Sequence, residues 1–323
     1  MLSAIRGFPK QFEASLKILE GTDLSKLGLQ KPRYVFFAGM GGSSLPADMV
    51  NDYLNHENPL RIVRDYQLPD YVNSRDWVIC SSYSGNTEET IEAFHDAIAH
   101  HANLIVMAYG GKLKSLAQEK EVPFVQIPEC IQPRCAVGNF FTSTLDILHA
   151  LGLIKSEKDN LLSLARTLKK DQKQYEEEGK KIAVFLKGRV PIIYGPSLIA
   201  SMCRIWKIKI NENAKVQSFW NVYPELNHNE MVGYTKLLMQ PAIVHLRTGL
   251  AHSRNLKRMD IVEELLGEEI PFLNLELKGQ SILEVLFEAN ALGDYASYYL
   301  ALEYGVDPAP VEMVESFKKK LER

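Results

Sequence analysis

Short apolar runs alternate with longer amphipathic stretches from residue 34 to residue 127. Apolar runs bounded by Gly and polar residues predict buried strands, and stretches with apolar positions three and four apart predict helices. The strands are predicted at residues 34–38, 61–64, 77–81, 104–107 and 124–127, and the helices at residues 47–54, 87–100 and 113–118. A leading helix is predicted over residues 8–27. This order favours a doubly wound parallel sheet with helices on both faces.

The second half of the chain repeats the order of strand, Gly and helix. Further strands are predicted at residues 190–194, 237–246 and 270–275, and helices at residues 158–186, 197–208, 282–304 and 311–321. The apolar stripe of the 282–304 helix is typical of a core or a dimer face. We therefore predict an α/β protein with two doubly wound, flavodoxin-like domains, at residues 1–153 and 189–323, joined by a charged connector helix at residues 154–188.

The stretch from Val78 to Thr90 is a strand that runs through a hydroxyl-rich loop into a helix. At such a helix N-terminus the main-chain N–H groups and the helix dipole favour an anion. The hydroxyls of Ser82, Ser84 and Thr87 add donors at the same point, which suits a phosphate ester. The alternative is an ordinary turn in which one of these residues caps the helix.

A second loop of this kind follows the strand at residues 34–38 and contains Gly42 and Ser43. Two such loops in one parallel sheet converge at the carboxyl ends of their strands, where open α/β sheets bind ligands. The run from Gly39 to Ser44 lacks the third Gly of a dinucleotide fingerprint and the Gly-Lys-Ser/Thr ending of a P-loop. A small phosphorylated ligand therefore fits these loops better than a nucleotide.

Three further polar sites are ambiguous when each is considered alone. Pro133 keeps the chain out of a helix just before Arg134, so this Arg is either aimed over the sheet edge or an ordinary surface residue. Glu212 follows an apolar helix and His228 lies in the next turn, where an exposed carboxylate and a turn-capping His are common. Lys318 belongs to a run of lysines that also suits a solvated helix C-terminus.

Composition and charge exclude some classes of protein. The 323 residues are 46% hydrophobic and 24% charged, with a formal net charge of −3, so the basic footprint of a nucleic-acid-binding protein is missing. The first residues lack the apolar core of a signal peptide, and no apolar run is long enough to span a membrane. We expect a cytoplasmic protein whose four scattered cysteines are free thiols, with a zinc site as the weaker alternative.

Together these motifs resemble a known family. The loops at residues 39–43 and 82–87 look like the phosphosugar-binding loops of a sugar isomerase (SIS) domain. The blocks at residues 211–216 and 221–230 look very like the catalytic block of the bifunctional phosphoglucose/phosphomannose isomerases. The resemblance covers essentially the whole chain. Ser44 stands where the family commonly has Gly, and Gln132 replaces a small residue before Pro133, but neither change removes a functional group.

The resemblance implies roles for individual residues. Glu212 would be the base that moves a proton between C1 and C2, and His228, contributed by the neighbouring subunit, would assist opening of the sugar ring. Arg134 would lie over the reacting centre, and Lys318 falls at the position of the family's C-terminal catalytic Lys. Gly42 and the hydroxyl residues Ser43, Ser82, Ser84 and Thr87 would hold the substrate phosphate.

These expectations combine into a hypothesis about function. The chain is expected to be an isomerase of glucose 6-phosphate, and also of mannose 6-phosphate, that requires no metal or other cofactor. It would work as a homodimer with shared active sites, and its partners would be sugar phosphates, with no nucleic acid or membrane. The alternative is a non-catalytic sugar-phosphate sensor, which would need the phosphate loops but has no use for Glu212, His228 and Arg134 together.

Overall fold

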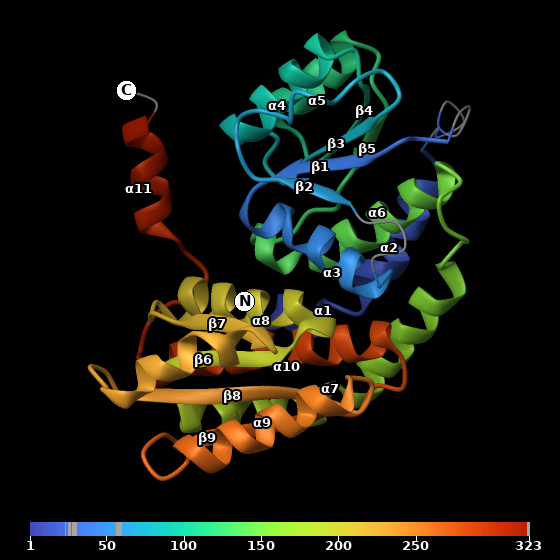
Figure 1. The fold of residues 1–323 in the computed structure, drawn as a ribbon. Coiled ribbons are helices and arrows are strands. Elements are labelled where there is room, and N and C mark those ends of the chain that lie inside the picture. Colours follow the sequence, from blue (N-terminus) through green and yellow to red (C-terminus); the bar gives the residue numbers. More distant parts are fainter. Residues whose placement is uncertain (23, 25–26, 28–30, 56–59, 322–323) are drawn as a thin grey trace. The chain divides into compact units, whose positions relative to one another are not determined.

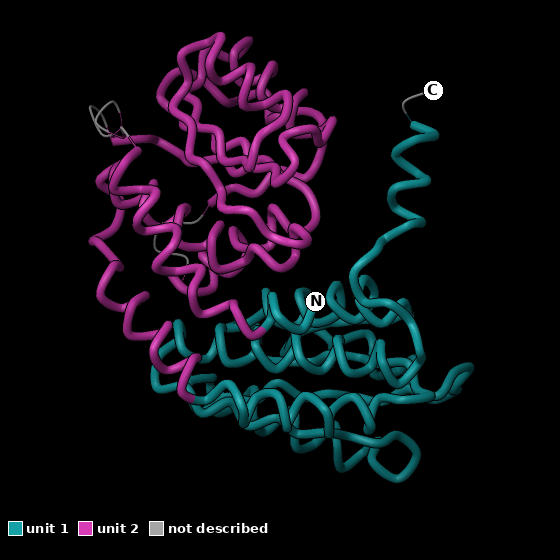
Figure 2. Tube along the Cα trace, turned by 180° about the vertical axis from the view of Figure 1, so that it is seen from behind, with its two compact units in different colours: residues 1–5, 171–323 teal, residues 6–170 magenta. Residues whose placement is uncertain are grey.

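A computed structural model describes residues 1–321 except 23, 25–26, 28–30 and 56–59. The chain forms two compact units (Figure 2). The N-terminal unit comprises residues 6–170, and the C-terminal unit comprises residues 171–323 with residues 1–5. Helix α7 (Lys158–Leu186) runs through the division between the units, in the stretch where a connector helix is predicted.

The sheet of the N-terminal unit has five parallel strands in the order β2-β1-β3-β4-β5. The strands are β1 (Val35–Gly39), β2 (Arg61–Val63), β3 (Trp77–Ser82), β4 (Asn103–Ala108) and β5 (Phe124–Gln126). From β1 the chain moves to β2 on one side, and β3 then pairs with β1 on the other side. The order therefore changes direction between β1 and β3, where ligands bind in sheets of this topology.

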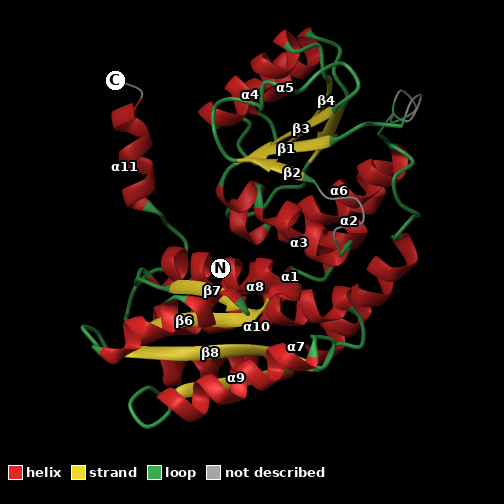
Figure 3. Ribbon diagram, viewed as in Figure 1, coloured by secondary structure: helices red, strands yellow, loops and turns green. Residues whose placement is uncertain are grey.

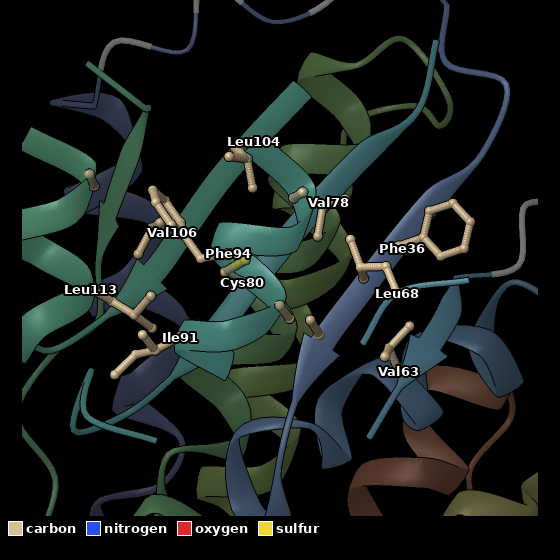
Figure 4. Close-up of a cluster of buried hydrophobic side chains, with 14 of the residues drawn as sticks. Phe36, Val63, Leu68, Val78, Cys80, Ile91, Phe94, Leu104, Val106 and Leu113 are labelled. Atoms are coloured by element: carbon tan, nitrogen blue, oxygen red, sulfur yellow. The ribbon is translucent and has the colours of Figure 1, made fainter. Parts of the chain in front are cut away.

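Helices cover both faces of this sheet (Figures 1 and 3). Helices α4 (Glu88–Ala99) and α5 (Gly111–Glu119) lie on one face, and α2 (Lys10–Glu20), α3 (Leu45–Tyr53) and α6 (Val137–Ala150) lie on the other. Figure 4 shows the core between the sheet and the first pair of helices, where Phe94 of α4 and Leu113 of α5 pack on Val78 and Val106 of the strands. The predicted doubly wound parallel sheet is confirmed.

The leading helix differs from the prediction. It is divided into α1 (Leu2–Gly7) and α2, which begins after Pro9 and ends at Glu20, where Gly21 follows. Pro favours the first turn of a helix, so the chain starts a new helix at Pro9 instead of continuing the previous one. Residues 23 and 25–26 of the predicted helix lie outside the described residues.

The C-terminal unit also contains a parallel sheet, with four strands in the order β7-β6-β8-β9. The strands are β6 (Val190–Pro196), β7 (Phe219–Tyr223), β8 (Pro241–Thr248) and β9 (Phe272–Leu277). Met259 and Val262 of α9 (Ser253–Leu266) pack on strand residues such as Ile192 and Ile243. Ile193, on the other face of the sheet, is also fully buried, so both faces are covered.

Two parts of the prediction for this unit were wrong. Strand β7 was not predicted, because it is an edge strand with two exposed aromatic residues and a central Asn that break the usual pattern. The strand predicted from residue 237 begins only at Pro241, and Leu238 before it is 88% exposed. The predicted start was therefore wrong because apolar residues of a surface loop were assigned to the strand.

The remaining helices of this unit are α8 (Ala200–Lys209), α10 (Ile282–Glu303) and α11 (Glu312–Leu321). The predicted apolar stripe of α10, which includes Leu283, Leu286 and Ala289, is buried. Helix α11 contains no buried residue. None of the helices in the described part of the chain is both long enough and apolar enough to cross a lipid bilayer.

Candidate active site

The two predicted phosphate loops are joined to each other at the carboxyl ends of β1 and β3. A short 3₁₀ turn (Gly41–Ser43) follows β1 and contains the buried Ser43. The main-chain N–H of Tyr83 donates a hydrogen bond of 2.9 Å to Ser43 Oγ. Ser81 Oγ donates another of 2.9 Å to the carbonyl oxygen of Ser43. The loops are therefore one connected structure at the point where the strand order changes direction.

The loop after β3 is organised by its own hydroxyl groups. Ser82 Oγ accepts a hydrogen bond of 3.1 Å from the main-chain N–H of Gly85 and lies 2.8 Å from Thr87 Oγ1. Thr87 occupies the N-cap position of α4, but its side chain makes no capping hydrogen bond. This hydroxyl is therefore not used as an ordinary helix cap. The exposed Ser84 accepts a hydrogen bond from the N–H of Asn86.

Gly85 is required where the β3 and β4 loops meet. Its φ is 70°, and a Cβ built on it would lie 1.7 Å from the carbonyl oxygen of Gly110. Beside this contact the main-chain N–H of Lys112 donates a hydrogen bond to Asn86 Oδ1. A side chain at position 85 would separate the two loops.

Arg134 lies beside the first phosphate loop. A Cβ on Gly42 would be 2.6 Å from the main-chain nitrogen of Arg134, so the two backbones approach as closely as Gly allows. Arg134 is only 3% exposed, which excludes the alternative that it is an ordinary surface residue. The structure thus brings together Arg134 and the β1 loop within the N-terminal unit.

Tyr83, which the sequence reasoning did not select, holds the segment that leads to Arg134. Its hydroxyl donates a hydrogen bond of 2.7 Å to the carbonyl oxygen of Cys130 and accepts one of 2.5 Å from the N–H of the same residue. Its ring stacks on Tyr109, with the ring centroids 5.7 Å apart. The only signal in the sequence was an aromatic residue inside a hydroxyl-rich loop, which does not indicate a partner.

In the C-terminal unit, Glu212 lies in a π-helical turn (Ile210–Ala214) that extends α8. Glu212 is half-buried, and the next residue, Asn213, is buried. The turn ends at Lys215, whose φ is 62°. Lys215 Nζ donates hydrogen bonds to the carbonyl oxygens of Glu212 and Pro310, at 2.5 and 2.6 Å. Single π-helical turns are rare and are often found at functional sites.

His228 is exposed at the end of a short 3₁₀ turn (Glu225–His228) that follows β7. Two residues later, Glu230 is hydrogen-bonded to the hydroxyl of Tyr194 on β6 and to the side-chain amide of Asn221 on β7. These contacts fasten the segment after His228 to the sheet. Because both partners come from strands, they hold it against a rigid support.

Glu212 and His228 lie on opposite sides of β7 along the chain. Glu212 belongs to the segment that enters this strand, and His228 belongs to the segment that leaves it. Strand β7 has five residues and, at about 3.3 Å per residue, spans about 16 Å. The segments that contain Glu212 and His228 therefore join this strand at opposite ends.

Through Tyr194, Glu230 contacts a buried cluster of Tyr and His side chains. The hydroxyl of Tyr194 lies 2.5 Å from that of Tyr234, and Tyr223 Oη lies 3.0 Å from His245 Nε2. Burial raises the pKa of Tyr234 to about 12 and that of Tyr194 further. Burial also lowers the pKa of His245 to about 4. These groups are therefore uncharged at neutral pH.

Lys318 lies on α11, where it is exposed and forms an ion pair with Glu315 at 3.0 Å. The structure does not bring it against Glu212 or His228 in any contact that it describes. Across residues 1–321 without the stretches left undescribed, no three His, Cys, Asp or Glu side chains are close enough together to hold a metal ion. Cys80, Cys130, Cys135 and Cys203 are free thiols, as predicted.

Comparison with known proteins reveals clear relatives. Residues 175–321 match the family model of the bacterial phosphoglucose isomerase C-terminal SIS domain. The chain is 35% identical to a bifunctional phosphoglucose/phosphomannose isomerase from Caldicellulosiruptor bescii, over 99% of this chain and 98% of the relative. It is 32% identical to a protein of the same name from Aquifex aeolicus, over 99% and 97% of the two chains.

A solved structure shows the same fold. Tagatose-6-phosphate ketose/aldose isomerase from Escherichia coli superposes with a TM-score of 0.74 over 95% of this chain and 93% of that structure, at 14% identity. At this identity the likeness concerns the fold alone, and it agrees with the predicted doubly wound parallel sheets.

Proposed function

The chain belongs to the bifunctional phosphoglucose/phosphomannose isomerase family, and we propose that it interconverts glucose 6-phosphate, and also mannose 6-phosphate, with fructose 6-phosphate. The observation that carries the proposal is the full-length relationship at 35% identity. The chain also contains Glu212, His228 and Arg134, to which the resemblance assigns catalytic roles. With this reaction the enzyme would take part in glycolysis and gluconeogenesis and would be found in the cytoplasm.

The substrate phosphate would be bound at the carboxyl ends of β1 and β3. Ser43, Ser84 and Thr87 would donate hydrogen bonds to it, and Ser82 would orient Thr87. Gly42 allows the backbone of this loop to lie against that of Arg134. The N-terminus of α4 adds main-chain donors and a partial positive charge. Binding at this end of the sugar would orient C1 and C2 for the reaction.

Glu212 would transfer the proton between the two carbons. It takes the proton from C2 of the open-chain aldose, which leaves a cis-enediolate. The hydroxyl proton moves from O2 to O1 through the cis-enediol, and Glu212 returns its proton to C1. Arg134 is permanently charged and would stabilise the negative charge that develops on these oxygens. With mannose 6-phosphate, rotation about C2–C3 before the transfer would present the opposite configuration at C2 to the same base.

Opening of the sugar ring requires a proton on the ring oxygen and the loss of one from the C1 hydroxyl. His228 suits this exchange, and Lys318 would assist it. Because Glu212 and His228 flank β7 at opposite ends, we propose that His228 acts in the active site of a second subunit of a homodimer. Mixing Glu212→Gln with His228→Ala subunits would then restore activity, whereas inactivity despite demonstrated subunit exchange would rule out shared sites.

The conversion of fructose 6-phosphate by the purified protein, with and without EDTA, tests the proposed activity. We expect both glucose 6-phosphate and mannose 6-phosphate to form at rates that the chelator does not change. The names of the relatives do not favour a non-catalytic sensor. Binding of sugar phosphate without any turnover would nevertheless support that alternative and overturn the proposal.

A further inference from the structure

A stripe of buried polar contacts joins α8 and its π-helical turn to α10. Lys209 is fully buried, and its Nζ lies 2.7 Å from Asp294 Oδ1 and 2.8 Å from Asn290 Oδ1. Farther along the same interface, Asn213 Nδ2 donates a hydrogen bond of 2.9 Å to Ser297 Oγ. The three partners on α10 are four and three residues apart, so they lie on one face of that helix.

The two helices are also fixed closely together before this stripe begins. Trp206 Nε1 donates a hydrogen bond of 2.8 Å to the carbonyl oxygen of Ala289. A Cβ on Gly293 would lie 2.7 Å from the same indole nitrogen, so only Gly allows this approach. With the indole held by a directional bond against the bare backbone, the helices cannot slide along each other without breaking contacts.

A buried ion pair is a weak source of stability, because the cost of removing two charges from water offsets most of their attraction. Its effect is directional, since a polar pair is satisfied in one register only, whereas apolar side chains tolerate several. The contacts of Lys209 and Asn213 with α10 therefore fix the position of the chain between these two residues relative to that helix. Apolar contacts would fix it less strictly.

The chain between these two contacts is the π-helical turn that contains Glu212. Lys209 is the last residue of α8, and Asn213 directly follows Glu212 in the turn. We infer that Lys209 and Asn213, held by Asp294 and Ser297, are positioning residues that fix Glu212 for proton transfer. The inference rests on the proposed function, in which Glu212 is the base, and adds the residues through which the scaffold controls that base.

Two variants test this inference in the full-length protein with fructose 6-phosphate as substrate. Ser297→Ala removes the hydroxyl that accepts the hydrogen bond from Asn213 Nδ2, with little change in volume. The double variant Lys209→Met/Asp294→Leu replaces the ion pair by apolar side chains. Because a displacement of about 1 Å at a reacting group costs about 100-fold in rate, we expect kcat to fall about 10- to 100-fold in both, with KM changed by no more than about twofold.

A matched control separates positioning from stability. Arg33→Met breaks another ion pair, between the half-buried Arg33 and the fully buried Asp76 in the N-terminal unit. This variant should lower Tm but leave kcat unchanged. If Ser297→Ala and the double variant keep the wild-type kcat and pH profile, the contacts are only structural and the inference is wrong. If the double variant does not fold, Ser297→Ala decides alone.

A failure of this inference can be distinguished from a failure of the proposed function. If the wild-type protein does not isomerise sugar phosphates, the proposed function is wrong. If the wild type is active and Glu212→Gln is equally active, Glu212 is not the base. If the wild type is active, Glu212→Gln is inactive and the positioning variants are fully active, only the present inference is wrong.

Discussion

The hydroxyl oxygen of Ser43 accepts a hydrogen bond of 2.9 Å from the main-chain N–H of Tyr83. Because the oxygen is used as an acceptor there, the hydroxyl proton points elsewhere and is available to donate. Ser43 therefore joins the β1 loop to the β3 loop and retains a donor for a ligand at the point between them. This arrangement accounts for a Ser, which both donates and accepts, at this position.

Ser43→Ala should weaken substrate binding. It would remove the proposed hydrogen bond to the charged phosphate as well as the one between the loops, and hydrogen bonds to charged groups contribute about 1.5 to 3 kcal/mol. We expect KM for fructose 6-phosphate to rise about 10- to 100-fold, with a smaller effect on kcat. Ser115→Ala, at an exposed position of α5, is the control and should leave KM unchanged. An unaltered KM in Ser43→Ala would show that the phosphate binds elsewhere.

Thr87 offers a second test of the phosphate site. Its hydroxyl pairs with Ser82 instead of capping α4, so Thr87→Val should raise KM while leaving the helix largely intact. Thr87→Ser keeps the hydroxyl and should restore KM to within about threefold of the wild type, because the hydrogen bond is kept. Equal KM values for the Val and Ser variants would contradict a hydrogen-bonding role. Circular dichroism of both variants checks that the overall helix content is unchanged.

The Tyr194 and Glu230 contact should matter for the segment that contains His228. Tyr194→Phe removes the hydroxyl that donates to Glu230 and lies against Tyr234, so the segment after β7 loses hydrogen bonds to the sheet. We expect kcat to fall several-fold and stability to fall by about 1 to 3 kcal/mol. Steady-state kinetics and urea unfolding provide both values.

Tyr53→Phe is the matched control for this change. Tyr53 also donates a hydrogen bond to a carboxylate, Glu157 at 2.7 Å, and burial likewise raises its pKa. It belongs to the N-terminal unit, whereas β7 belongs to the C-terminal unit. This variant should lose comparable stability without a loss of kcat, and a similar loss of kcat in both variants would refute a specific effect on His228.

The buried His245 predicts a pH dependence of stability. Burial lowers its pKa to about 4 in the folded protein, against about 6.5 in the unfolded chain. The unfolded state therefore binds a proton that the folded state does not, and stability falls as the pH drops from about 6.5 towards 4. The full loss, reached below pH 4, is on the order of 3 kcal/mol.

Thermal unfolding at a series of pH values measures this effect. The decrease in Tm between pH 7 and pH 5 should be smaller in His245→Gln than in the wild type, because Gln does not titrate. If both proteins show the same slope, His245 does not contribute and other groups cause the acid sensitivity.

The elements that the sequence predicts well depend on local signals. Strands β1 and β3 are continuous apolar runs, and the loops after them are marked by Gly and Ser, so the sheet and the positions of these two loops follow from neighbouring residues. Strand β7 was not predicted because its exposed Phe219 and Trp220 and its Asn221 follow no burial pattern. Its place at the sheet edge is set by pairing with β6.

The supports of the site could not be predicted, because their partners are distant in the sequence. Lys209 and Asn290 are 81 residues apart, and the polar residues of α10 look like interruptions of an apolar helix until α8 is placed against them. The two hydrogen bonds of Tyr83 to Cys130 likewise join residues 47 positions apart. The π-helical turn has no sequence signature, since it depends on which main-chain partner each N–H finds.

The most direct test of the account is the rate of isomerisation of fructose 6-phosphate by Glu212→Gln, with both aldose products measured. Gln has the size and polarity of Glu but cannot accept the proton, and Glu268→Gln, an exposed carboxylate on the same unit, serves as the control. The account predicts that Glu212→Gln loses at least about 1,000-fold in kcat for both products while it still binds sugar phosphate. A kcat within about tenfold of the wild type would show that Glu212 is not the base and would contradict the mechanism.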